Sequence, residues 1–104
     1  MTKSRRTKAL EIPQKVKDIV WERDQYRCII CGSHEGQPNS HFIRRSQGGL
    51  GCEERNIVTM CYRCHMMYDQ GSDRRAIEQY TENYLKNLYP DWNREQLYYK
   101  KGEF

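Results

Sequence analysis

The chain has 104 residues, a net charge of +4 and five cysteines, and 31% of its residues are charged. A chain of this length forms one small domain, which buries a limited share of its surface and therefore gains much from a bound metal ion. It contains no apolar run of the ~20 residues that a membrane span needs. The composition thus argues against a membrane protein, and we expect a cytoplasmic location.

The positive charge is concentrated at the start of the chain. Residues 1–8 hold four cations and no acidic group, so residues 9–104 carry the remaining 14 of 18 basic groups against 14 acidic groups. We expect residues 1–11 to form a flexible basic tail that binds nucleic-acid phosphates without reading sequence. A solvated terminus without a binding role is the alternative.

The first regular element should follow this tail. Pro13 suits the first turn of a helix. Val16, Ile19 and Val20 recur at helical spacing. We therefore expect a helix over about residues 13–23.

A hairpin is predicted next. Residues 33–40 are rich in Ser, Gly, Pro and Asn and should form a loop. Two short strands are expected over residues 41–44 and 56–60, with a glycine-containing connection between them.

Helices should dominate the rest of the chain. A helix over residues 62–70 would carry His65 and Asp69 on one face. Residues 72–104 should form a helical extension: a helix over about residues 73–88 capped by Ser72, then a short helix capped by Asp91. The inward stripe of the long helix is expected to contain Ile77, Tyr80, Tyr84 and Leu88.

Two Cys-x2-Cys pairs are the strongest motif in the sequence. Cys28 and Cys31 are separated from Cys61 and Cys64 by a 29-residue insert. This spacing is typical of a structural zinc site, in which four thiolates leave no open position for chemistry. Disulfides are the rival use, but the cysteine count is odd, and Cys52 is interpreted as a spare thiol.

Catalytic groups must therefore lie elsewhere. His41 is the candidate in the insert between the two cysteine pairs, and histidine suits a general base because its pKa lies near neutral. His65 and Asp69 stand at i, i+4 on the predicted helix, the spacing that directs two side chains toward one ion. His34 has no partner at ligand spacing and is interpreted as a surface loop residue.

These motifs together resemble a known family. Their order and spacing are similar to those of HNH endonucleases of the small phage and prophage type, within the His-Me finger (ββα-metal) group. The resemblance implies an α+β fold with a zinc-stapled ββα-metal core over residues 12–71 and flanking N- and C-terminal helices. It rests on the stretch from Ser40 to Gly49, on the stretch from Asn56 to Met60, and on Cys61, Cys64 and His65.

The resemblance also implies roles. His41 would be the general base, Asn56 the residue that pins the hairpin loop, and His65 a ligand of one catalytic ion (Mg²⁺, Mn²⁺, Ni²⁺ or Zn²⁺). The implied reaction is hydrolysis of double-stranded DNA. A phage terminase would be a functional neighbour, and the location would be the host cell if the gene is phage-borne. Phosphate contacts are expected from Arg44, Arg45 and Arg63.

Two positions depart from the family pattern. Ser40 stands where many relatives have a second metal ligand, so we expect Asp69 to supply that ligand together with His65. Arg44 stands where proline is common.

Each assignment has a structural alternative. His41 could be a buried strand histidine, Asn56 a turn cap and Asp69 a helix-end carboxylate. For the whole protein, the alternative is a non-catalytic zinc-knuckle module that binds nucleic acid. A third hypothesis is that the substrate is RNA.

Overall fold

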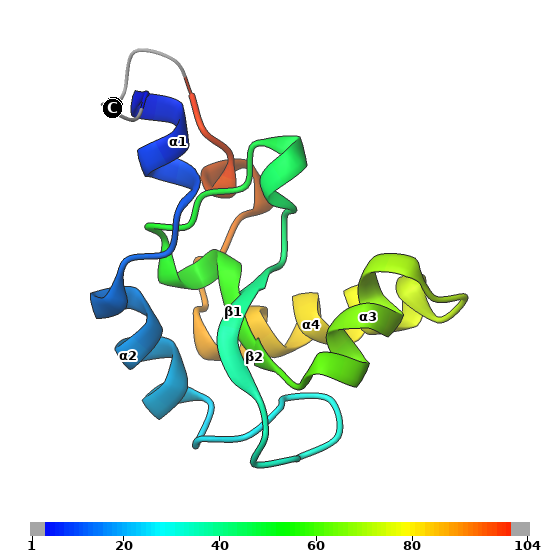
Figure 1. Ribbon diagram of the computed structural model, residues 1–104. Helices are drawn as coiled ribbons and strands as arrows, with labels where there is room; N and C mark the ends of the chain where they lie inside the picture. Colours follow the sequence, from blue (N-terminus) through cyan, green and yellow to red (C-terminus); the bar gives the residue numbers. More distant parts are fainter. Residues whose placement is uncertain (1–3, 101–104) are drawn as a thin grey trace.

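The computed structural model describes residues 4–100 as a mixed fold of helices around a two-stranded sheet. Figure 1 shows α2 on one side of the hairpin, with α3 and α4 packed together on the other. Three 3-10 turns, η1 to η3, fill the connections. In chain order the regular elements are α1 (Arg5–Leu10), α2 (Gln14–Arg23), β1 (Gln37–His41), η1 (Arg45–Gln47), η2 (Glu54–Asn56), β2 (Ile57–Met60), α3 (Tyr62–Gln70), α4 (Arg74–Leu88) and η3 (Arg94–Leu97).

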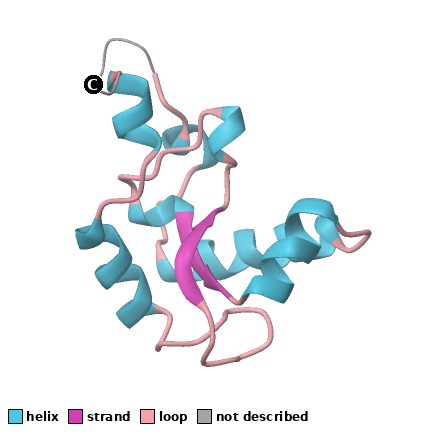
Figure 2. Ribbon diagram, in the orientation of Figure 1, coloured by secondary structure: helices cyan, strands magenta, loops and turns pink. Residues whose placement is uncertain are grey.

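The sheet is a short antiparallel pair (Figure 2). His41 pairs with Ile57 and Ser40 with Val58, and the register is irregular between Gln37 and Ser40. All four residues of β2 are buried. β2 is therefore covered on both faces, whereas β1 is buried only at Ser40.

Two apolar clusters flank the sheet. The larger one joins β2, α3 and α4 to η3, and it contains an edge-to-face contact between Phe42 and Trp92. The smaller one packs Val16 and Val20 of α2 against Ile57. The hairpin is thus fixed from both sides, which gives the residues at its ends defined positions.

A buried polar network ties the two sides together. The carboxylate of Asp24, at the end of α2, accepts hydrogen bonds from the Arg23 guanidinium, from Thr59 N of β2 (2.8 Å) and from the Tyr84 hydroxyl of α4. Arg23 also donates to the carbonyls of Glu54 and Ile57. Because every charge here has partners, its burial is compensated.

The prediction of a flexible tail over residues 1–11 was wrong for the part that the structure describes. Ser4 caps α1 by accepting a hydrogen bond from Thr7 N (3.1 Å). Ala9 and Leu10 are buried, so the end of α1 packs against the domain. Residues 1–3 lie outside the described part of the chain.

The first strand also differs from its prediction. β1 begins at Gln37, within the predicted loop, and ends at His41 instead of Arg44. Pairing with the buried strand β2 overrides the turn preference of Pro38 and Asn39. Beyond His41, Ile43 N donates to the side chain of Asn56 (2.7 Å) instead of continuing the ladder.

The helices α2, α3 and α4 confirm the predicted spans within one residue at each end. The predicted caps are wrong: Asp73 stands at the N-cap of α4, and Asn93, which accepts from Glu95 N, caps η3. The last element is a 3-10 turn. The buried stripe of α4 runs through Ile77, Thr81 and Leu85, whereas Tyr80 and Leu88 are exposed.

None of the helices within residues 4–100 is long and apolar enough to cross a membrane.

Candidate functional site

The four cysteines of the two pairs form one cluster. Their sulfur atoms all lie within 4.8 Å of one another, and the Sγ atoms of Cys31 and Cys61 are 3.6 Å apart. Cys61 and Cys64 stand at the start of α3, and Cys28 and Cys31 form the turn that faces it. Cys52 is exposed and lies outside the cluster. The arrangement fits a single metal ion with four thiolate ligands, as the sequence predicted.

The ionisation of the cluster supports this fit. Burial raises the pKa of the Cys28 thiol, but backbone N–H groups of Cys31, Cys61 and Ile30 bring it down to about 7. Burial and the other three cysteines raise the pKa of the Cys64 thiol. A divalent cation removes this mutual repulsion, because it binds thiolates and deprotonates coordinating thiols.

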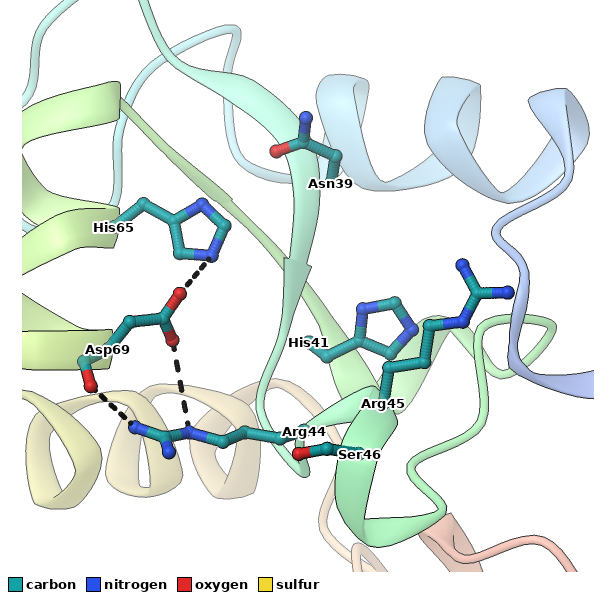
Figure 3. A pocket seen from close by; sticks show the side chains of 7 residues that line it. All are labelled: Asn39, His41, Arg44, Arg45, Ser46, His65 and Asp69. Atoms are coloured by element: carbon teal, nitrogen blue, oxygen red, sulfur yellow. Dashed lines mark hydrogen bonds and ion pairs between the residues drawn. The ribbon is translucent and has the colours of Figure 1, made fainter.

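A cavity of about 330 Å³ lies on the other face of α3 (Figure 3). It brings together most of the residues that the sequence singled out, from β1, from the loop after it and from α3. Its walls are formed by Asn39, His41, Arg44, Arg45, Ser46, His65 and Asp69. The two histidines that the sequence separates by 24 positions therefore line one cleft.

His41 stands at the last position of β1 and is half-buried. Its Nε2 atom lies 2.9 Å from the carbonyl oxygen of Leu10. Because a carbonyl only accepts hydrogen bonds, Nε2 must carry the proton, and in the neutral ring Nδ1 then carries the free lone pair.

The surroundings of His41 favour its neutral form. Burial is the largest cause of a lowered pKa, and electrostatic interactions with Arg45 and His65 lower it further, although the hydrogen bond to Leu10 opposes them. A neutral imidazole at pH 7 is the form that can accept a proton from water.

His65 and Asp69 are neighbours across one turn of α3. The distance between His65 Nε2 and Asp69 Oδ2 is 3.2 Å, and both side chains are more than a third exposed. Two ligands of one ion lie about 3 Å apart, because each bond is about 2.1 Å long. The pair therefore fits two positions of an open metal site. Within residues 4–100 it does not belong to a larger group of His, Cys, Asp and Glu side chains.

The three predicted phosphate-binding arginines have different environments. Arg44 is engaged with α3: it donates to the carbonyls of Tyr68 and Asp69, and its Nε lies 3.8 Å from Asp69 Oδ1. Arg45 is exposed at the cleft. Arg63 is exposed beside the cysteine cluster, outside the cleft.

Asn56 is fully buried and does not line the cleft. Its amide nitrogen donates to the carbonyls of Ile43 (3.2 Å) and Leu50 (2.9 Å), and its oxygen accepts from Ile43 N. One side chain thus joins Ile43 to Leu50 within the loop that connects the strands.

Sequence reasoning missed two cleft residues, Asn39 and Ser46; for Asn39 a signal was present. Side chains alternate along a strand, so Asn39 and His41 share the cleft side of β1, whereas Ser40 is fully buried in the interior. That alternation was the available signal, but residues 33–40 were expected to form a loop. Ser40 therefore lies on the opposite side of β1 from His65.

Comparison with known proteins adds one relative. No family model matches the chain, and no solved structure matches it. The chain is similar to a curated protein of Nostoc sp. (strain PCC 7120 / SAG 25.82 / UTEX 2576) named anaredoxin, with 27% identity over 71 residues. The aligned part covers 68% of this chain and 88% of the relative.

Proposed function

We propose that this protein is a metal-dependent HNH endonuclease that hydrolyses phosphodiester bonds in DNA. In this proposal β1, β2 and α3 are the ββα-metal core, the four cysteines hold a structural zinc ion, and His41 is the general base. His65 and Asp69 bind the catalytic divalent ion.

One observation carries the proposal. His41 and His65 line the same cavity, and the hydrogen bond from His41 Nε2 to the Leu10 carbonyl directs the basic Nδ1 atom to other partners. A strand histidine with a purely structural role would need neither the shared cavity nor the cationic surroundings.

The residues of the cleft divide the work of hydrolysis. His41 Nδ1 takes a proton from the attacking water, and the lowered pKa keeps that atom unprotonated at neutral pH. Arg45, exposed at the edge of the cleft, attracts the phosphate and orients it. A divalent ion at His65 and Asp69 would supply charge neutralisation at the phosphate and the leaving oxygen.

The decisive experiment is a plasmid-nicking assay with zinc-loaded protein and added Mg²⁺, Mn²⁺ or Ni²⁺. Loss of a general base reduces turnover by ~10²–10⁴-fold, so His41→Ala should cut far more slowly than the wild type. His34→Ala is the matched control, because His34 is exposed on a loop outside the cleft. Equal cutting by the wild type and by His41→Ala would refute the proposal.

A non-catalytic zinc module that binds nucleic acid is the second candidate. The observation in its favour concerns Ser40. The residue beside His41 is a serine whose side chain is buried, so it does not provide a metal ligand at the cleft. Clean protein that binds DNA but does not cut it with any of the three ions would support this candidate.

An iron centre is the third candidate for the four cysteines. Four thiolates bind iron as well as zinc, and the relative of this chain is named anaredoxin. Zinc has no redox chemistry, so the metal decides between a structural and an electron-transfer role. Elemental analysis and the visible absorbance of the purified protein distinguish the two, because zinc thiolate sites are colourless.

A further inference from the structure

The carbonyl that holds His41 comes from the N-terminal segment, 31 positions earlier in the chain. Leu10 is 2% exposed, and its side chain anchors the end of α1 in the domain. At this point the chain leaves α1, so the Leu10 carbonyl is not used in a further helical turn. It is therefore available to accept the hydrogen bond from the imidazole.

A second contact fixes the same segment from the other side. The backbone N–H groups of Gly51 and Cys52 approach the carbonyl of Ala9 at 2.9 and 3.4 Å. A Cβ atom at Gly51 would overlap the carbonyl oxygens of Leu10 and Glu11. The close approach therefore needs glycine at position 51.

Position 51 is in turn held by Asn56. The Asn56 amide donates to the carbonyl of Leu50, the residue directly before Gly51. A continuous set of hydrogen bonds and chain neighbours thus leads from the Asn56 side chain through Leu50 and Gly51 to Ala9 and Leu10, and ends at the His41 ring.

We infer that the segment from Ala9 to Glu11 is the positioning element of His41, and that Asn56 orients the base through this segment. Leu10 and Gly51 are then positioning residues, since neither lines the cleft beside the two histidines. The inference rests on the proposed function. The position of the His41 proton on Nε2, however, can be measured whether or not the protein cuts DNA.

The test substitutes Gly51 by alanine in the full-length, zinc-loaded protein. The new methyl group must displace the Leu10 carbonyl, so the base loses its fixed orientation. A misplacement of about 1 Å can cost roughly 10²-fold in rate, and we expect a fall of that size in kcat for plasmid nicking. DNA affinity should be unchanged, because Arg45, the residue proposed to attract the phosphate, is kept.

A spectroscopic signature separates positioning from general damage. Long-range ¹⁵N–¹H NMR spectra should show the Nε2–H tautomer of His41 in the wild type and a mixture of tautomers in Gly51→Ala. Asn56→Asp should also give a mixture, because a carboxylate cannot donate to the Leu50 carbonyl. Cys52→Ala is the matched control: it keeps the neighbouring backbone contact and adds no bulk, so tautomer and kcat should stay as in the wild type.

If Gly51→Ala does not fold, Leu10→Ala takes its place, since it removes the buried anchor and keeps every peptide group. A folded variant with wild-type kcat and a single Nε2–H tautomer overturns the inference. A wild type that cuts no DNA refutes the proposed function alone, because the tautomer of His41 can still be read.

Discussion

The two walls of the cleft are built in different ways. The α3 wall carries His65 and Asp69 on one helix, whose other face buries Cys64 and Tyr68. The β1 wall carries His41, whose orientation depends on a carbonyl from α1. One wall is thus organised by neighbours in sequence and by the cysteine cluster, and the other by contacts between distant segments. The comparison teaches that the two histidines of one cleft depend on different contacts, so a substitution can displace one of them without displacing the other.

The largest expected effect is the loss of folding when the cysteine cluster beside α3 is disrupted. Cys28→Ser removes one of the four sulfurs, and a structural zinc contributes roughly 10–16 kcal/mol of apparent free energy, more than most domains have in total stability. We expect loss of the helical signal in circular dichroism. Cys52→Ser, outside the cluster, is the control, and an unchanged thermal melt of Cys28→Ser would contradict the structural role of the metal.

The next largest effect is a loss of stability when the buried network around Asp24, which connects the two sides of the hairpin, is disrupted. Asp24→Ala leaves the Arg23 guanidinium buried without its carboxylate, and removing one partner of a buried pair costs about 3–5 kcal/mol. Urea denaturation should show the loss as a lower midpoint. Asp18→Ala, on the exposed side of the same helix, should leave the midpoint close to that of the wild type. An equal midpoint for Asp24→Ala would show that the network is dispensable.

A smaller effect weakens the open site without touching the fold. Asp69→Asn removes the negative charge beside His65, and loss of support at a metal site lowers affinity by about 10–100-fold. Titration calorimetry of Mn²⁺ into zinc-loaded protein measures this directly. Asp73→Asn, beyond the end of α3, is the comparison variant. Unchanged Mn²⁺ affinity in Asp69→Asn would show that the carboxylate is a helix-end residue without a metal-binding role.

The smallest effect concerns pH and the β1 wall. Burial, Arg45 and His65 lower the pKa of His41 below 6.5, so its imidazole is unprotonated above that pH and becomes protonated only at lower values. The acid limb of kcat/KM should therefore lie below pH 6.5. Arg45→Gln removes one lowering charge and should move the limb to higher pH. Arg27→Gln, which is exposed and outside the cleft, should not move it.

Local patterns in the sequence predicted the α3 wall well. The span of α3, the cysteine cluster and the pairing of His65 with Asp69 all follow from spacing, because side chains four residues apart share a helix face. The role of Asn56 was implied by the family resemblance alone, and in the structure its side chain donates to the carbonyls of Ile43 and Leu50.

The β1 wall could not be predicted in the same way. The basic composition of residues 1–8 favoured a tail, and nothing local indicated that Leu10 would pack into the domain. Asn39 was missed because the turn-forming residues around it hid a strand that only pairing with β2 stabilises. Contacts across 31 positions leave no periodic signal in the sequence.

The use of a main-chain oxygen to hold His41 has a consequence for reading natural variation. No amino-acid replacement at position 10 deletes a peptide carbonyl, so an alanine scan would score that site only by its apolar packing. The intolerance would be recorded instead at position 51, where every residue larger than glycine intrudes on the same oxygen. In a collection of sequences from many genomes, an unvarying glycine there would mark the arrangement around His41 more faithfully than any side chain of the N-terminal helix.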